Sequence, residues 1–232
     1  MDILEWDSTF FGFKIGRIVL DKELDVQNSL FELEKKESVL TYVFSREPVE
    51  KSMLRRYNGE LADTKVWFTK TILDVDANFS DKSIVEDAKY LDKEKIYKLA
   101  YLSGNYSRFK LDSNIPRKKF EQMYKLWVDN SLSGNLASKV FVYLLSNEIV
   151  GFVTLAVKDG FGEIGLIAVA AEAQGKSIGS KLIHRVEVFL KQNGIEELRV
   201  PTQKENRQAM QFYKKNNFLV LEEILIYHFW NK

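Results

Sequence analysis

Two short segments in the last third of the chain carry residue types that can do chemistry. The first is a turn of small and polar residues, Gln174-Gly-Lys-Ser-Ile-Gly179, between an apolar strand pattern and an amphipathic helix pattern. The N–H groups of a first helical turn have no partner within the helix, and together with the helix dipole they bind anions such as a pyrophosphate. Lys176 and the hydroxyls of Ser177 and Ser180 add hydrogen-bond donors. We therefore interpret this segment as a phosphate-binding turn.

A simpler alternative stays open, in which the segment is an ordinary strand-to-helix connection and its glycines serve the turn alone. Two better-known phosphate motifs are absent from the sequence. The P-loop pattern Gly-x-x-x-x-Gly-Lys-Ser/Thr is missing, and so is the dinucleotide pattern Gly-x-Gly-x-x-Gly. If the turn binds phosphate, it does so in a different structural context.

The second segment is a predicted helix that contains Asn206 and Tyr213. Seven residues are about two helical turns, so both side chains lie on one face. Asn206 suits the N-cap, where its side chain could also meet a ligand, and Tyr213 could donate a phenolic proton. The alternative is that Asn206 only caps the helix and Tyr213 only packs in the core. Because the two segments follow each other with one helix and one strand between them, we favour a shared site.

The elements that must position these residues follow from hydrophobic periodicity and turn signals. Strands are expected at 13–20, 39–44, 65–72, 84–85, 140–145, 149–157, 163–169, 197–201 and 224–230, and helices at 26–37, 51–56, 93–102, 117–128, 178–192 and 207–215. Tight antiparallel turns are expected at Asn147-Glu148 and Asp159-Gly160. The polar segment 74–82 is the best linker candidate. It predicts a small α/β domain at 1–82 and a second domain at 83–232.

Composition excludes several classes of protein. The 34 basic and 33 acidic residues give a formal charge of +1, which argues against a nucleic-acid partner held by bulk charge. Cysteine is absent and only His184 and His228 supply imidazoles, so disulfides, thiolate nucleophiles and multi-histidine metal centres are not expected. The chain shows neither a signal-peptide pattern nor the run of about 20 apolar residues that spans a bilayer. The prediction is a soluble, cytoplasmic protein without a metal or a membrane partner.

The strand at 163–169, the turn at 174–179 and the helix at 206–218 together resemble the acetyl-CoA site of the GNAT superfamily of N-acetyltransferases. The resemblance implies an α/β (α+β) fold with a mixed, mostly antiparallel central sheet flanked by helices. It implies acetyl-CoA as acetyl donor and Tyr213 as general acid to the CoA thiolate. The residues that it assigns to the cofactor are Ile167, Ala168 and Val169 through their backbone, Gln174, Gly175, Lys176, Ser177, Ile178, Gly179 and Ser180 around the pyrophosphate, and Asn206.

Two positions depart from the family pattern. Ser177 stands at the usual central glycine of the turn, and Asn217 replaces the glycine before Phe218. Asparagine tolerates the left-handed conformation that follows a helix end, so the second change is mild. Serine is small and can donate a hydrogen bond.

Three further segments resemble a narrower family, the bacterial N-acetyltransferases of dTDP-4-amino-4,6-dideoxygalactose. They are Trp6-Asp-Ser-Thr-Phe-Phe-Gly12, Tyr106-Ser-Arg-Phe109 and Leu198-Arg-Val-Pro-Thr-Gln203. The resemblance implies a nucleotide-linked amino sugar as acceptor, with the first domain on the acceptor side. Arg108 could then pair with a diphosphate and Tyr106 could stack on a ring. Alternatively, Arg108 is a surface cation and the aromatic residues belong to the core.

Several alternatives remain open at the level of the sequence. The acceptor could be another amine, such as a peptide N-terminus, an antibiotic or a polyamine, or the protein could be an acetyl-CoA-binding module without catalysis. No general base is assigned. Glu163 lies at the start of a strand, where a solvated strand end is the favoured interpretation, and a water chain to solvent would serve equally well as a base. A homodimer through the apolar strand 224–230 is a further expectation, on the argument that an edge strand has to be covered.

Overall fold

The chain divides into two compact units. The structure is a computed structural model and describes residues 1–20, 31–73, 75–76, 79–86 and 91–231. Unit 1 comprises residues 1–66, 203–205 and 222–232, and unit 2 comprises 67–202 and 206–221. The long strands β4 (Gly59–Thr71) and β10 (Leu219–Trp230) therefore each contribute to both units. The division into 1–82 and 83–232 differs from these units and stays a prediction about folding domains.

Unit 1 is a small α/β unit, with strand order β1-β2-β3-β10-β4. Its other elements are β1 (Asp2–Ile3), α1 (Glu5–Phe11), β2 (Ile15–Leu20), the 3-10 helix η2 (Glu32–Lys35), β3 (Leu40–Ser45) and α3 (Lys51–Arg56). Strand β2 runs parallel to β3, and β3 runs antiparallel to β10. The helix expected at 26–37 falls in part on residues 26–30, which lie outside the described residues, and Glu32–Lys35 form a 3-10 helix.

The strand at 224–230 is not an edge strand, which corrects the argument for a homodimer. Residues Leu225 to Trp230 of β10 pair with Ser45 to Leu40 of β3, and β10 lies between β3 and β4 in the strand order. Its apolar side chains are covered within the chain, since Ile226, Tyr227 and Phe229 are buried. The pattern was apolar because the strand is central, and this strand gives no reason to expect a partner chain.

Unit 2 has the strand order β4-β9-β8-β7-β6-β5. Its strands are β5 (Ile84–Val85), β6 (Lys139–Leu145), β7 (Glu148–Lys158), β8 (Phe161–Val169) and β9 (Glu197–Gln203), and its helices are α4 (Lys93–Ser103), α5 (Arg108–Leu111), α6 (Arg117–Leu132), η4 (Ala171–Ala173), α7 (Ile178–Gln192) and α8 (Arg207–Lys215). The pairs β5–β6, β6–β7 and β7–β8 are antiparallel, and β8–β9 is parallel. The expected mixed, mostly antiparallel sheet is confirmed.

Tight two-residue turns join the antiparallel strands β6, β7 and β8. Asp159 and Gly160 both have positive φ, as a two-residue hairpin turn of the mirror-image type requires, and they join β7 to β8 as predicted. The preceding turn is centred one residue earlier than predicted, on Ser146 and Asn147, which also have positive φ. Asparagine tolerates this conformation, which explains why Asn147 marked the turn correctly.

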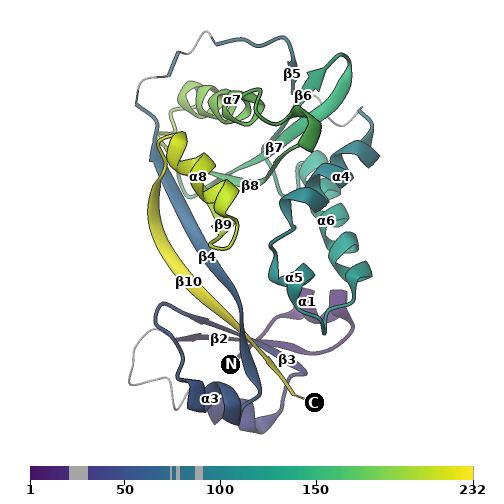
Figure 1. Cartoon of the computed structure of the whole chain (residues 1–232), viewed down its shortest axis with the longest axis vertical. Coiled ribbons are helices and arrows are strands. Elements are labelled where there is room, and N and C mark those ends of the chain that lie inside the picture. Colours follow the sequence, from purple (N-terminus) through teal and green to yellow (C-terminus); the bar gives the residue numbers. More distant parts are fainter. Residues whose placement is uncertain (21–30, 74, 77–78, 87–90, 232) are drawn as a thin grey trace. The chain divides into compact units, whose positions relative to one another are not determined.

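Helices cover both faces of the sheet in unit 2. Six consecutive residues of β7, from 150 to 155, are buried, which requires cover on both sides because neighbouring side chains point to opposite faces. Helices α4 and α6 lie together on one side and α7 on the other (Figure 1). Helix α7 presents the predicted apolar stripe, in which Ile178, Leu182, Ile183, Val186 and Leu190 are buried. The cores at both faces hold the strand ends that form the site.

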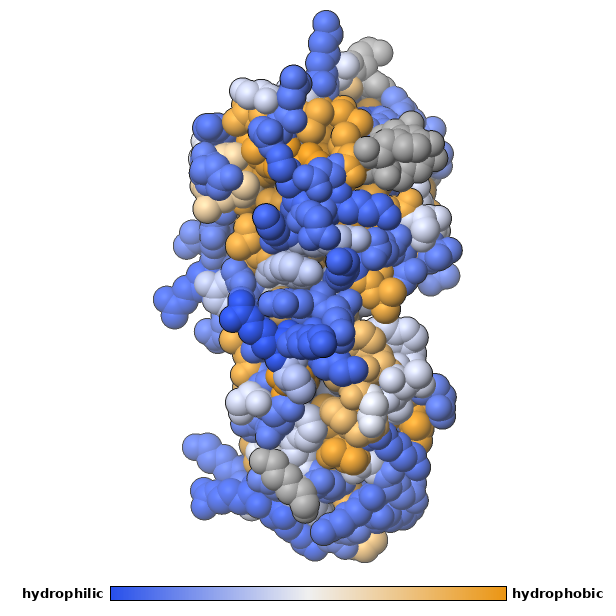
Figure 2. Space-filling view, turned by 90° about the vertical axis from the view of Figure 1, so that its right-hand side faces the viewer, coloured by the Kyte–Doolittle hydropathy of each residue, from blue (hydrophilic) through white to orange (hydrophobic). Residues whose placement is uncertain are grey.

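On the face shown in Figure 2, hydrophilic side chains predominate and apolar residues form smaller groups between them. Among the described residues, no helix has both the length and the apolar character needed to cross a membrane.

Candidate active site

A cavity of about 330 Å³ lies within unit 2, where four segments meet. They are the end of α4, the end of β8, the turn before α7 with its first helical residues, and α8. The lining residues are Leu102, Ser103, Ile167, Ala168, Val169, Ala173, Gln174, Gly175, Ser177, Ile178, Gly179, Ser180, Asn206, Gln208, Ala209, Phe212, Tyr213 and Lys215. The fold thus brings the predicted phosphate-binding turn and the Asn206–Tyr213 helix together at one cavity.

The end of β8 offers backbone groups to this cavity. Val169 faces Gly151 of β7, and the N–H of Ala170 donates to the carbonyl of Val150 at 2.7 Å. This pattern makes Val169 and Gly151 a non-hydrogen-bonded pair, so the N–H and C=O of Val169 point away from β7. On that side lies β9, which pairs with β8 at Gly162 and Glu163, far from Val169. The N–H of Val169 can therefore donate to an extended ligand, whereas the carbonyl oxygen of Val169 already accepts the side-chain Nε2 of Gln174 at 3.2 Å.

The turn before α7 adopts the conformation that the sequence pattern requires. Gly175 has a φ of 76° and Ser177 a φ of 58°, so both lie in the left-handed region. Ser177 is the N-cap of α7 and makes no side-chain capping bond, which leaves the first N–H groups of the helix available to a ligand. A left-handed conformation is uncommon for a residue with a Cβ atom, so Ser177 holds it at some conformational cost.

Gly179 has a role in packing. A Cβ atom at this position would lie 3.0 Å from the Phe212 ring of α8. A small residue at 179 therefore lets α7 and α8 approach each other beside the cavity. Lys176, by contrast, is exposed and is not among the lining residues, so the structure does not bring it to the cavity with the rest of the turn.

Asn206 and Tyr213 fulfil their structural roles and also line the cavity. The Oδ1 of Asn206 accepts the N–H of Ala209 at 3.1 Å and caps α8, as the simpler alternative expected. Tyr213 is buried, and its ring packs against Phe68, Phe212 and Phe218 at centroid distances of 5.4, 5.3 and 5.6 Å. Burial raises the pKa of the Tyr213 phenol well above its ordinary value near 10. The phenol is therefore protonated at neutral pH and able to donate.

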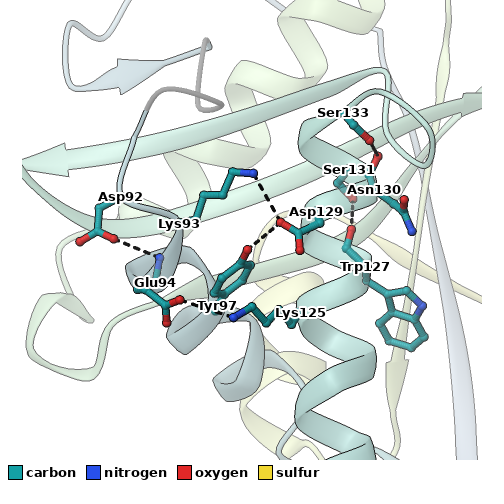
Figure 3. Close-up of polar contacts among 10 residues, drawn as sticks. All are labelled: Asp92, Lys93, Glu94, Tyr97, Lys125, Trp127, Asp129, Asn130, Ser131 and Ser133. Atoms are coloured by element: carbon teal, nitrogen blue, oxygen red, sulfur yellow. Dashed lines mark hydrogen bonds and ion pairs between the residues drawn. The ribbon is translucent and has the colours of Figure 1, made fainter. Parts of the chain in front are cut away.

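Helix α4 contributes Leu102 and Ser103 to the cavity, and a polar network fixes this helix against α6 (Figure 3). The hydroxyl of Tyr97 donates to Asp129 at 2.6 Å, and Lys93 pairs with the same carboxylate at 3.5 Å. The ammonium of Lys125 lies 4.6 Å from the centre of the Tyr97 ring. Burial, with the bond to Asp129, raises the pKa of Tyr97. This network keeps α4 in register with α6.

The close crossing of the two helices depends on Gly104. A Cβ atom at this position would lie 2.4 Å from the Tyr124 ring of α6. Sequence reasoning missed Leu102 and Ser103 because nothing in the local pattern of α4 indicates that its end faces a strand 60 residues further on. It also missed Gln208, Ala209, Phe212 and Lys215, although these share a helix with Asn206 and Tyr213.

The residues predicted for the acceptor lie outside the lining of this cavity. Tyr106 is 42% exposed in the segment before α5. Arg108 begins α5, and its guanidinium carbon lies 4.4 Å from the centre of the Phe109 ring. Glu163 pairs with Lys158 at 2.9 Å and does not line the cavity, which agrees with a strand-end carboxylate.

Comparison with known proteins agrees with this geometry. Residues 106–218 match the family model described as the acetyltransferase (GNAT) family. Streptothricin acetyltransferase A of Bacillus subtilis is 32% identical over 81 residues, which are 34% of this chain and 47% of that protein. The chain spans less than half the length of the curated relatives it matches.

Two solved structures share the fold over most of the chain. A conserved protein of unknown function from Staphylococcus epidermidis superposes with a TM-score of 0.60 at 11% identity, covering 94% of this chain and 84% of that one. A GCN5-related N-acetyltransferase from Sphaerobacter thermophilus gives a TM-score of 0.54 at 14% identity, with 89% and 68% covered. The cavity elements, the matched family model and the shared fold agree: residues 106–218 are similar to the acetyltransferase domain of the GNAT family, and the chain has the fold of that family.

Proposed function

We propose that this protein transfers an acetyl group from acetyl-CoA to the amine of a nucleotide-linked 4-amino-4,6-dideoxy sugar in the cytoplasm. The proposed transferase activity is supported mainly by the cavity, which is lined by Val169, the start of α7 and Tyr213. The acceptor is proposed from the resemblance of residues 6–12, 106–109 and 198–203 to enzymes that use such sugars.

The residues present fit acetyl-CoA. The uncapped start of α7, with left-handed Gly175 and Ser177, suits the pyrophosphate, and Lys215 places a cation at the cavity wall. The end of β8 from Ile167 to Val169 lines the cavity and suits the pantetheine arm. When bound, acetyl-CoA supplies an activated acetyl thioester.

The chemistry of the chain's own residues follows from their positions. The N–H of Val169 would donate to the carbonyl oxygen of the thioester as negative charge develops there, a contribution of about 3 kcal/mol where such donors have been removed. As the amine nitrogen forms its bond to the carbonyl carbon and the carbon–sulfur bond breaks, the Oη of Tyr213 would give its proton to the departing sulfur. The amine has to be neutral when it attacks. Its nitrogen then loses one proton to solvent, and the Tyr213 phenolate regains one proton from solvent, so the protons balance.

A second acceptor class has its own support. The similarity to streptothricin acetyltransferase A over 81 residues favours a small-molecule amine such as an antibiotic. A third reading, an acetyl-CoA-binding module without catalysis, is opposed by the presence of both Asn206 and Tyr213 at the cavity.

A thiol-release assay with acetyl-CoA distinguishes these readings. The acceptor panel contains dTDP- and UDP-linked 4-amino-4,6-dideoxy sugars, a peptide amine, spermidine, streptothricin and an aminoglycoside. Release with a nucleotide-linked sugar alone supports the proposal. Release with another amine keeps the transferase and rejects the sugar. Binding of acetyl-CoA without release for any amine favours the binding module.

A further inference from the structure

Two glutamine side chains join three walls of the cavity in unit 2. The Nε2 of Gln208, on α8, donates to the Oε1 of Gln174 at 3.0 Å. The Nε2 of Gln174 in turn donates to the carbonyl oxygen of Val169 at 3.2 Å. All three residues line the cavity. We call this chain of hydrogen bonds the glutamine bridge, and it connects α8, the phosphate-binding turn and the end of β8.

The bridge has a fixed direction. A glutamine side chain has one carbonyl oxygen, which accepts, and one NH₂ group, which donates. Gln174 uses its NH₂ group on the carbonyl of Val169, so its oxygen is left to accept. Only a donor at position 208 can complete the bridge in this arrangement. A side chain without a donor at 208 breaks it.

The glutamine bridge supports a turn whose backbone has an uncommon conformation. Gln174 begins the segment, and Gly175 and Ser177 follow with positive φ. The backbone N–H of Gln174 reaches the carbonyl of Ala171 at 3.3 Å, near the long end of the hydrogen-bond range. The side-chain bonds of Gln174 therefore help to fix where the turn starts. A turn that is fixed before binding loses less conformational entropy when a ligand orders it.

We propose that Gln208 is a positioning residue for acetyl-CoA. By donating to Gln174, Gln208 holds the phosphate-binding turn against the end of β8. The N–H groups at the start of α7 are therefore already oriented when acetyl-CoA binds. This inference rests on the proposed binding of acetyl-CoA at the cavity. Loss of the donor raises the Kd for acetyl-CoA by about 3-fold to 10-fold, which is the range for one net hydrogen bond.

The test compares Gln208→Leu with the matched control Gln211→Leu. Gln211 lies on the same helix, is exposed and does not line the cavity. Isothermal titration calorimetry with acetyl-CoA measures Kd for the wild type and both variants, and circular dichroism checks that both variants melt as the wild type does. We expect weaker binding for Gln208→Leu alone. Equal Kd values for the two variants overturn the proposal.

A double-mutant cycle separates the bridge from direct contact between Gln208 and the ligand. If Gln208 acts through Gln174, the double variant Gln174→Leu with Gln208→Leu binds acetyl-CoA no more weakly than Gln174→Leu does. If Gln208 contacts the ligand directly, the two losses add, and the proposal is wrong.

Kinetics give an independent readout with any amine that the acceptor panel identifies. In Gln208→Leu the KM for acetyl-CoA rises while kcat stays within about twofold, because a positioning residue for binding does not take part in the proton transfer. A fall in kcat with an unchanged KM contradicts the positioning role. Absence of acetyl-CoA binding by the wild type overturns the proposed function together with this inference, whereas normal binding by Gln208→Leu overturns the inference alone.

Discussion

Tyr213 is at once a core residue and a cavity residue. Its ring contacts Phe68, Phe212 and Phe218, and it also lines the cavity. These two roles are compatible because a phenol has an apolar ring and a polar tip. Burial favours the neutral phenol, which is the form that a general acid needs.

At the residue scale we expect Tyr213→Phe to lose turnover and keep binding. Removing a general acid typically costs about 10²-fold to 10⁴-fold in rate. The ring and its packing are retained, so the Kd for acetyl-CoA should stay within about twofold. Thiol-release kinetics and calorimetry measure the two quantities. Unchanged turnover would remove Tyr213 from the mechanism.

The same variant has an expected effect on alkaline stability. The pKa of Tyr213 is raised in the folded protein, so its contribution to stability is complete below the unfolded value near 10 and is lost as the pH rises above it. Between pH 9 and pH 11, the melting temperature of the wild type should therefore fall more steeply with pH than that of Tyr213→Phe.

Ser177 carries a conformational cost that glycine would avoid. Its φ of 58° is uncommon for residues with a Cβ atom and is worst for β-branched side chains. We predict that Ser177→Gly has a free energy of unfolding at least equal to that of the wild type. The free energy of unfolding of Ser177→Val should be lower than that of the wild type by about 1–3 kcal/mol. Urea titrations measure the order. A Ser177→Val protein as stable as the wild type would show that the turn does not require this conformation.

At the scale of elements, a partly buried ion pair links β4 to α7. The Nζ of Lys70 lies 2.5 Å from Oε1 of Glu187, whose side chain is 5% exposed, and Nδ1 of His184 lies 3.5 Å from the other oxygen. Removing one partner of such a pair leaves a charge without its counter-ion in a poorly solvated place. The strand at 59–71 is thereby coupled to the helix that begins at the cavity.

We therefore expect Lys70→Met to destabilise the protein by about 3 kcal/mol. Adding Glu187→Leu in the same chain should recover part of the loss, because the unpaired carboxylate is then gone. Guanidinium unfolding of the wild type, the single variant and the double variant measures these differences. A double variant that is less stable than Lys70→Met would argue against the ion-pair explanation.

At the scale of the whole molecule, strands that are distant in sequence complete each unit. Phe68 and Ile72 of the segment after residue 66 are buried in unit 2, and residues 222–232 return to unit 1. A chain cut anywhere near residue 82 would separate residues that belong to one core. The division at residue 82 can be tested on this basis.

The fragment 83–232 lacks Phe68 and Ile72. Truncating one large buried side chain already lowers the free energy of unfolding by about 2–5 kcal/mol. Total stabilities of domains are only about 5–15 kcal/mol. We therefore expect this fragment to show no cooperative thermal transition by circular dichroism, while the full chain does. A sharp transition in the fragment would support residue 82 as a true domain boundary.

The sequence by itself predicted most elements because their signals are local. Helices α7 and α8 have the predicted bounds, since an apolar stripe and a polar stop such as Asn193-Gly194 act within a few residues. Asn217 has a φ of 63°, the left-handed conformation that its residue type tolerates. The turn and helix motifs indicated the resemblance to the GNAT family for the same reason, because each motif consists of residues that are adjacent in the sequence.

Only the tertiary structure decided which distant residues meet. Short α1 and α5 were missed because neither is long enough to show a period, and the partner of strand 224–230 was missed because apolar patterns do not distinguish an edge strand from a central one. Leu102 and Ser103 reach the cavity through the packing of α4 on α6, and Gln208 meets Gln174 because α8 lies beside the turn. Such contacts depend on how packed elements cross, and residue order along the chain does not specify that geometry.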